Sequence, residues 1–137
     1  MKLSTRSRYG TRLMLDMAEH YNDGPIRLMT IAQRQDISVK YLEQIIIPLK
    51  KAEYIKSVRG PKGGHKLTRS PEEITIGEIV AVLEDGVSLV ECSDNGDSCK
   101  RASFCPTRHI WREASLAMFE RLNSMTLADL LAKTQGL

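Results

Sequence analysis

The chain of 137 residues is poor in aromatic residues, with two Phe, one Trp and four Tyr. So few rings argue against a base-stacking surface of the kind that binds single-stranded nucleic acids. The chain also lacks an apolar run approaching the roughly 18 residues that a membrane-spanning helix needs. Its first ten residues, MKLSTRSRYG, are basic, but no apolar region of a signal peptide follows them. We therefore expect a soluble, cytoplasmic protein that has no membrane partner.

Patterns that mark enzymes are also missing. The chain has no nucleophile elbow, no glycine-rich phosphate-binding loop and no pair of carboxylates arranged for acid–base chemistry. We therefore expect no catalytic activity and no small-molecule substrate. The three cysteines are an odd number, and a reducing compartment argues for thiolate chemistry rather than for a disulfide framework.

The net charge of +3 conceals an asymmetry between the two halves of the chain. Residues 1–70 carry 14 Lys and Arg against 6 Asp and Glu, whereas residues 71–137 carry 6 against 11. A basic half beside an acidic half suggests an anionic partner for the first half alone. Two surfaces that differ only in their solvation would give the same balance, so charge alone leaves both interpretations open.

The first half shows the periodicity of three helices. Apolar residues recur at helical spacing over 4–21, and a second helix is expected around 29–35. A third helix is expected over 39–52, where Ser38 would be the N-cap. Pro48 lies inside this third helix and should kink or loosen its last turns.

The third helix is followed by two short strand-like runs, at 54–58 and 65–68. The turn between them, at 59–64, is too rich in Gly and Pro to be helical, so the segment predicts a hairpin. Helix, short helix, turn, longer helix and basic hairpin, in this order, are typical of a winged helix-turn-helix. In that fold the third helix can enter the major groove, and the hairpin can approach phosphates or the minor groove.

The residues of this region with suitable chemistry and position are the candidates for DNA binding. They are Ser38, Lys40, Tyr41, Glu43, Gln44, Arg59, Gly60, Pro61, Lys62, Gly63 and Gly64. The alternative is a helix-turn-helix used only for packing, with a solvated charged hairpin.

The second half of the chain adds further helices around a polar loop. Thr75 and Glu78 fit a capping box that starts a helix to about residue 84, and residues 91–105 form the loop. A long helix is expected from Pro106 to Asn123, followed by a short one capped by Thr126. The expected fold is thus mainly α with a small β wing, in one compact domain. Residues 1–70 would bind DNA, and residues 71–137 would form a cysteine-loop sensor and a long C-terminal dimerisation helix.

Four features that span essentially the whole chain together resemble the IscR/NsrR/CymR family of bacterial winged-helix repressors. They are SVKYLEQ at 38–44, SVRGPKGG at 57–64, the cysteine loop, and LNSMTLADL at 122–130. The resemblance implies a homodimer whose long C-terminal helices cross and whose heads bind a palindromic operator in double-stranded DNA. It also implies that Tyr41, Glu43 and Gln44 face the major groove and that Arg59 enters the minor groove.

The three cysteines of the loop follow the spacing C-x6-C-x5-C. Cys92, Cys99 and Cys105 are followed by His109, four residues after the last of them. Thiolates suit iron–sulfur clusters and zinc, but this spacing departs from the usual zinc knuckle. The residues alone leave open a cluster, zinc, thiol sensing or unliganded cysteines. The resemblance favours an iron–sulfur cluster, of the 2Fe–2S rather than the 4Fe–4S type.

The fourth ligand is where the chain departs from the family pattern. IscR-type members have a histidine three residues after the third cysteine, where this chain has Arg108, and His109 is one residue further on. One residue is a rotation of about 100° on a helix, so the two positions point in different directions. NsrR-type members use an acidic residue near the N-terminus of the other subunit, but the comparable residue here is Arg8. His109 is the candidate fourth ligand, with a shift in register at the helix start to compensate for the rotation; the alternative is a ligand from elsewhere.

The sequence thus predicts a homodimeric, sequence-specific transcription regulator, expected to be a repressor, that is most similar to IscR-type regulators. Its operator binding would depend on the cluster. A cluster-free or thiol-sensing repressor of the same family is the alternative, and an iron–sulfur electron carrier would not need the winged head.

Overall fold

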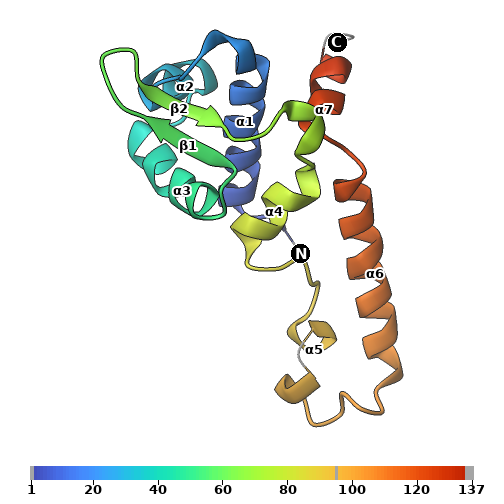
Figure 1. The fold of residues 1–137 in the computed structure, drawn as a ribbon. Helices are drawn as coiled ribbons and strands as arrows, with labels where there is room; N and C mark the ends of the chain where they lie inside the picture. Colours follow the sequence, from blue (N-terminus) through green and yellow to red (C-terminus); the bar gives the residue numbers. More distant parts are fainter. Residues whose placement is uncertain (1, 95, 135–137) are drawn as a thin grey trace.

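The computed structural model describes residues 2–94 and 96–134, so Met1, Asn95 and residues 135–137 of the two expected regions lie outside the described residues. The described chain is mainly helical with one two-stranded antiparallel sheet (Figure 1), which confirms the predicted fold class. Its main elements are α1 (Thr5–Glu19), α2 (Leu28–Gln35), α3 (Val39–Lys51), β1 (Ile55–Val58), β2 (Gly64–Leu67), α4 (Ile76–Glu84), α5 (Glu91–Asp94), α6 (Pro106–Asn123) and α7 (Leu127–Thr134).

Helix α1 is the centre of the part that we call the head, residues 4–84 and 127–134. Ser4 caps α1 by accepting a hydrogen bond from the N–H of Ser7, as its position before the apolar stripe suggests. The stripe buries Leu13, Met14 and Met17 completely. Helices α2, α3, α4 and α7 all pack against α1, so one hydrophobic core holds the head together.

A buried carboxylate on α1 fixes the position of α2. Asp16 is only 1% exposed, and it accepts hydrogen bonds from Nε and Nη2 of Arg34 at 3.0 and 2.6 Å. The amide of Gln35 donates a third, at 3.0 Å. The pKa of Arg34 is raised, chiefly by its hydrogen bond to Asp16. Because a buried charge needs a partner, this pair sets the angle at which α2, the first helix of the helix-turn-helix, leaves α1.

Helix α3 begins where the sequence indicates, since the hydroxyl of Ser38 accepts from the N–H of Tyr41 at 3.1 Å. Its buried residues are Leu42, Ile45, Ile46 and Leu49. Pro48 does not end the helix, which continues to Lys51. Proline removes only one N–H donor, and the carbonyl that loses it belongs to exposed Gln44, where water can replace it.

The hairpin β1–β2 is the wing, and its base is fixed to the segment before α2. Its register runs from the Ile55–Leu67 pair to the Val58–Gly64 pair. Ile26 exchanges two backbone hydrogen bonds of 2.8 Å with His65, whose pKa is lowered by burial and by Lys50. At Gly64, where φ is +154°, a Cβ would lie 2.6 Å from the backbone of Ile26, so this close approach requires glycine.

The hydrophobic core includes residues from both sides of the expected boundary at residue 70, because α4 and α7 contribute to it. Capping boxes start both helices, Thr75 with Glu78 and Thr126 with Asp129. The two starts are joined by backbone hydrogen bonds, such as that from the N–H of Leu127 to the carbonyl of Ile74 at 2.9 Å. The second half of the chain is therefore anchored in the head.

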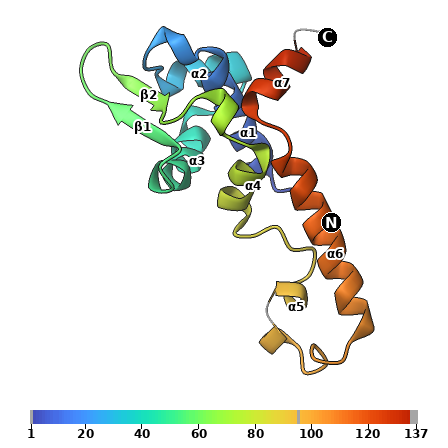
Figure 2. The ribbon, with the colours of Figure 1, turned by 45° about the vertical axis from the view of Figure 1, so that its right-hand side comes forward.

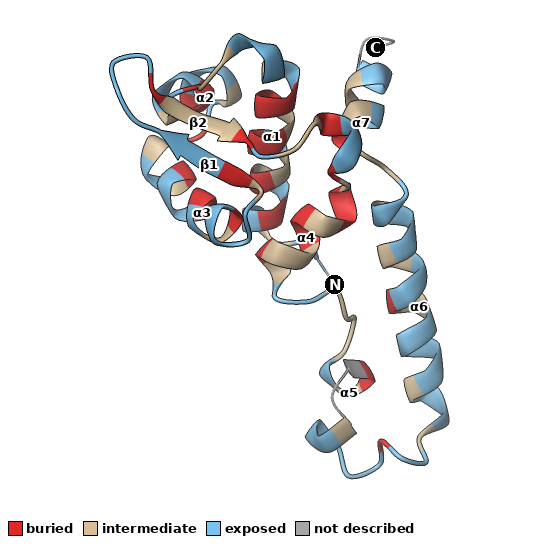
Figure 3. Cartoon of the chain, in the orientation of Figure 1, coloured by how far each residue is buried: buried red, intermediate tan, exposed pale blue. Residues whose placement is uncertain are grey.

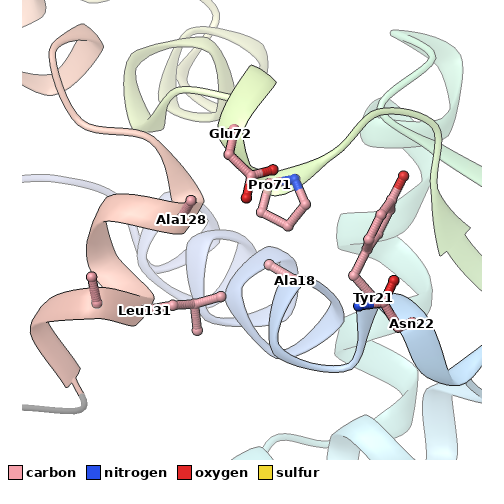
Figure 4. A pocket seen from close by; sticks show the side chains of 8 residues that line it. Ala18, Tyr21, Asn22, Pro71, Glu72, Ala128 and Leu131 are labelled. Atoms are coloured by element: carbon pink, nitrogen blue, oxygen red, sulfur yellow. The ribbon is translucent and has the colours of Figure 1, made fainter.

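An open hollow of about 480 Å³ lies where α7 leans on the end of α1 (Figure 4). It is lined by Ala18, Tyr21, Asn22, Pro71, Glu72, Ala128, Leu131 and Ala132. Among these described residues Glu72 is the one charged side chain, so the hollow does not bring together a set of charged groups.

Helix α6 runs along one side of the molecule, and α5 lies at the end of α6 that is remote from the wing (Figures 1 and 2). The structure describes all of α6, in which Ser115 is the one buried residue (Figure 3). Ile110 and Trp111 are 50% and 43% exposed. So much apolar exposure leaves this helix without the cover that an amphipathic helix normally finds. None of the described helices is long and apolar enough to cross a membrane.

Candidate nucleic-acid interface and cysteine segment

Helix α3 presents a polar stripe on the side opposite its buried residues. Lys40, Glu43 and Gln44 are exposed and share one face through their spacing of three and four residues. They offer an ammonium donor, a carboxylate acceptor and an amide that does both. These are the groups that distinguish base edges in the major groove, where an α-helix fits. Ser38, a further candidate, uses its hydroxyl oxygen as the cap of the same helix.

Tyr41 differs from the other candidates because it is half-buried. Its ring meets the ring of Tyr9 edge to face, with centroids 5.8 Å apart and planes at 87°. The guanidinium of Arg12 lies 5.3 Å from the centre of the Tyr9 ring. Tyr41 is thus held by packing on α1, so it also fixes the orientation of the polar stripe.

The tip of the wing is exposed at Arg59, Gly60, Pro61 and Lys62, and both ribbon views place the hairpin beside α3 (Figures 1 and 2). Gly60 has a φ of +113°, a conformation that favours glycine. Nη2 of Arg27 donates to the carbonyl of Pro61 at 2.9 Å, which ties the tip to the segment before α2. Two cations on a tethered turn suit contact with a phosphate backbone.

Gly63 and Gly64, also candidates, lie closer to the base of the wing. Gly63 is buried, and a Cβ there would collide with the carbonyl oxygen of Val58. Gly64 is half-buried against Ile26. Both glycines therefore shape the hairpin, and the exposed tip consists of the four residues before them.

The cysteines lie on residues 91–105, which we call the cysteine segment. The sequence predicted a loop, but the structure forms α5 and a short 3-10 helix, η3 (Gly96–Ser98), within it. Cys92 on α5 is half-buried, Cys99 is exposed, and half-buried Cys105 directly precedes α6; all three are free. Among the described residues no three Cys, His, Asp or Glu side chains converge as metal ligands would. The segment thus brings the thiols to one end of α6 without gathering them.

Arg108 fastens both parts of the cysteine segment to α6. Its Nε donates to the carbonyl of Cys92 at 2.5 Å, and its Nη1 donates to the carbonyl of Ala102 at 3.1 Å. This contact was missed by sequence reasoning, in which Arg108 counted only as the residue that replaces a ligand. Its place one turn into the helix that follows Cys105 was the available signal.

Cys105 lies where its surroundings favour the thiolate form. Its pKa is lowered chiefly by the hydroxyl of Thr107, whose oxygen lies 3.2 Å from the sulfur, and further by backbone N–H groups of the first turn of α6. Such groups stabilise a negative charge at a helix N-terminus. A thiolate is the form that binds metal.

The candidate fourth ligand, His109, and the residue at the NsrR-type ligand position, Arg8, are both exposed. His109 is exposed on α6, whereas the neighbouring Arg108 is half-buried against the segment. Arg8, at the position of the acidic NsrR-type ligand, is exposed on α1 and donates to the hydroxyl of Thr5 at 3.3 Å.

Serines anchor the linker between α4 and the cysteine segment. The buried hydroxyl of Ser115 on α6 accepts from the N–H of Leu89 at 2.9 Å and donates to the carbonyl of Trp111 at 2.8 Å. The hydroxyls of Ser88 and Ser93 lie 2.6 Å apart. Ser115 thereby attaches Leu89 to α6, and the contact between Ser88 and Ser93 closes the start of the cysteine segment onto the linker.

The end of α4 is attached in turn to the start of α1, through contacts that we call the α1–α4 clasp. The carboxylate of Glu84 accepts from the N–H of Ser4 at 2.8 Å, and Nε of Arg6 donates to the carbonyl of Leu83 at 2.9 Å. Hydrogen bonding by Ser4 is the chief reason that the pKa of Glu84 is lowered. A continuous set of contacts therefore leads from the cysteine segment to α1.

Comparison with known proteins agrees with this architecture. Residues 3–133 match the Rrf2 family, described as iron-dependent transcriptional regulators. Protein rrf2 of Nitratidesulfovibrio vulgaris is 50% identical over 131 residues, which cover 96% of this chain and 87% of the relative. The transcriptional regulator IscR of Vibrio parahaemolyticus is 38% identical over 137 residues, covering 100% and 81%.

Two solved structures are similar over nearly the whole chain. IscR of T. potens has a TM-score of 0.80 and 40% identity, covering 98% of this chain and 88% of its own. CymR, the global cysteine regulator of B. subtilis, has a TM-score of 0.80 and 38% identity, covering 97% and 98%. These relatives confirm the predicted resemblance, the winged-helix fold and a regulatory rather than enzymatic role. The chain belongs to the Rrf2 family of DNA-binding transcriptional regulators.

Proposed function

We propose that this regulator is a homodimeric repressor of a palindromic operator and that an iron–sulfur cluster, 2Fe–2S rather than 4Fe–4S, controls its affinity. The observation that carries the proposal is the separation of two chemistries along α6. An exposed polar stripe and a basic wing lie in the head, and three free thiols lie at the opposite end. Residues 1–70 would read DNA, and residues 71–137 would sense and dimerise.

The donor set of the cysteine segment fits an iron–sulfur cluster. Cys92, Cys99 and Cys105 are free and would supply three soft thiolates, with His109 as the fourth ligand. Such a cluster, when bound, makes a regulator responsive to iron supply and to oxidants. The description of the family as iron-dependent supports this choice.

The test of the sensor is to purify the protein without oxygen and to measure visible absorption, iron and acid-labile sulfide per chain. About two iron and two sulfide per chain support the 2Fe–2S proposal, whereas about four of each indicate a 4Fe–4S cluster. Colourless protein that holds no iron after reconstitution contradicts it. That outcome favours a cluster-free or thiol-sensing repressor. The exposed Cys99 and the similarity to CymR support this alternative.

Base readout by α3 predicts an effect of Glu43→Ala on specificity. A carboxylate in the major groove accepts a hydrogen bond from cytosine N4 and disfavours other edges. Removing it should lose about 1–3 kcal/mol of discrimination at particular base pairs. Titrations of the operator and of single-base variants measure this loss, with Glu73→Ala, an exposed carboxylate outside α3 and the wing, as the control. Unchanged binding of both operator and scrambled site by Glu43→Ala would refute the readout.

Contact of the wing with the DNA backbone predicts a different result for Arg59→Ala and Lys62→Ala. Each variant should weaken binding to operator and to non-specific DNA alike, and each lost phosphate contact should lower the slope of log affinity against log salt by about one. Lys133→Ala removes the same charge from α7 and should leave the slope as it is. A slope unaltered in the wing variants would place the phosphate contacts elsewhere.

Dimerisation through α6 predicts that Ile110→Glu produces a monomer at micromolar concentration. Ile110 and Trp111 are exposed on a helix with a single buried residue, and a palindrome requires a twofold partner. Sedimentation measures the mass, and Met29→Glu introduces the same charge at an exposed apolar residue of α2 as the control. A monomeric wild-type protein that still binds its operator would contradict the proposal.

A further inference from the structure

One apolar side chain on α3 is exposed although its neighbours are buried. Ile47 is 63% exposed, whereas Ile45 and Ile46, which precede it, are 0% and 4% exposed. The three isoleucines are consecutive and chemically identical, so the side chain itself does not explain their different exposure. The rotation of about 100° per residue along the helix places two of them in the core and the third in solvent.

Ile47 lies in the middle of the polar stripe of α3. At 100° per residue it is within about 20° of the direction of Lys40, and between the directions of Glu43 and Gln44. At 1.5 Å per residue it lies about 10 Å along the axis from Lys40, or about three base-pair steps. Recognition helices of homeodomains read bases over the same seven-residue span.

A single exposed isoleucine on a protein surface needs no explanation by itself. This one is unusual because the rest of its stripe carries polar groups suited to base edges, and an aliphatic group has one natural target there. Thymine alone displays a methyl group in the major groove, at C5, and apolar side chains distinguish it by contact.

We propose that Ile47 is a specificity-determining residue that contacts the 5-methyl group of a thymine in each half-site. This inference rests on the proposed binding of DNA through α3. Glu43 and Gln44 would read polar edges, and Ile47 would add readout of a T·A pair near the C-terminal end of the helix. Burial of one methyl group changes affinity by about fourfold.

The experiment uses the duplex that the wild-type full-length protein selects from a pool of random DNA. Each thymine of a half-site is replaced in turn by deoxyuridine, which keeps every hydrogen-bonding group and lacks only the methyl. Wild-type protein is expected to lose about fourfold in affinity at one thymine. Ile47→Ala is expected to bind the thymine and deoxyuridine duplexes equally at that position, while keeping any loss at other positions.

Two variants provide controls. Met29→Ala truncates another exposed apolar residue of the head and should keep the wild-type sensitivity to the methyl group. Ile47→Val retains a β-branched side chain and should keep part of the sensitivity to the methyl group. Because Ile47 is largely exposed, circular dichroism and the melting temperature of Ile47→Ala should match those of the wild type.

The outcomes separate this inference from the proposed function. A wild type that selects no sequence would overturn the proposed operator binding, and this inference with it. A selected site at which no thymine methyl matters would overturn the role of Ile47 alone. So would an Ile47→Ala variant with the wild-type pattern of methyl sensitivity, since another residue would then make the contact.

Discussion

Replacing Cys92, Cys99 or Cys105 with alanine is expected to abolish cluster binding and to leave a folded dimer. Each thiol would be one of four ligands, so its loss removes a bond that no other cysteine of the chain can replace. None of the three belongs to the hydrophobic core of the head or to the exposed face of α6. Iron and sulfide per chain after anaerobic reconstitution, together with sedimentation and circular dichroism, measure the two effects.

The same series tests the fourth ligand. His109→Ala is expected to bind a cluster that is lost faster in air or to a chelator than that of the wild type. Ser103→Ala changes an exposed hydroxyl of the same segment and should behave as the wild type. A cysteine variant with the full wild-type content of iron would show that its thiol is not a ligand.

The parts of the fold that the sequence predicted well are those with local causes. Ser38, Thr75 and Thr126 mark helix starts because a cap bonds to backbone two or three residues away. Pro106 marks the start of α6 for a similar reason, since its missing N–H costs nothing at a first turn. The wing follows from a Gly- and Pro-rich turn between short strands.

Contacts between distant residues were not predictable from the pattern. Asp16 appears in the sequence as a polar residue beside apolar ones, and its partner Arg34 is 18 positions away. Arg108 likewise reaches Cys92, 16 positions back. Many arginines of the chain could donate to the carboxylate of Asp16 or to the carbonyl of Cys92. Only the fold of the backbone determines which arginine lies close enough.

The cysteine segment shows the same limit in secondary structure. Its polar composition indicated a loop, yet the structure contains α5 and η3. Helices of three or four residues have little intrinsic stability, so neighbouring contacts decide whether they form. Here these contacts come from Arg108 and Ser115 of α6, which no periodicity in residues 91–105 reveals.

The operator affinity of the reconstituted protein is expected to differ from that of the apo protein by about 5- to 150-fold, the range of ordinary allosteric coupling. Bound ligands change affinity only by stabilising one arrangement of the head over another. Ligation through Cys92 and Cys105 would join α5 to the start of α6. Because Arg108 already fastens both ends of the segment, the change in order on losing the cluster should concentrate in residues 96–101.

The contacts that transmit this change are expected to include the α1–α4 clasp, since it joins the end of α4 to the helix on which α2 and α3 pack. The double variant Arg6→Ala, Glu84→Ala should therefore retain its cluster and lose most of the affinity difference between the two forms. Arg8→Ala, an exposed arginine of the same helix outside the clasp, is the matched control.

Both the cluster-bound and the apo form of each variant are titrated against one operator at fixed salt, because salt alone changes the affinity. Equal affinities of wild-type holo and apo protein for every operator tested would deprive the cluster of a regulatory role. If the clasp variant instead keeps the wild-type ratio of holo to apo affinity, the coupling must pass through α6 and the dimer partner.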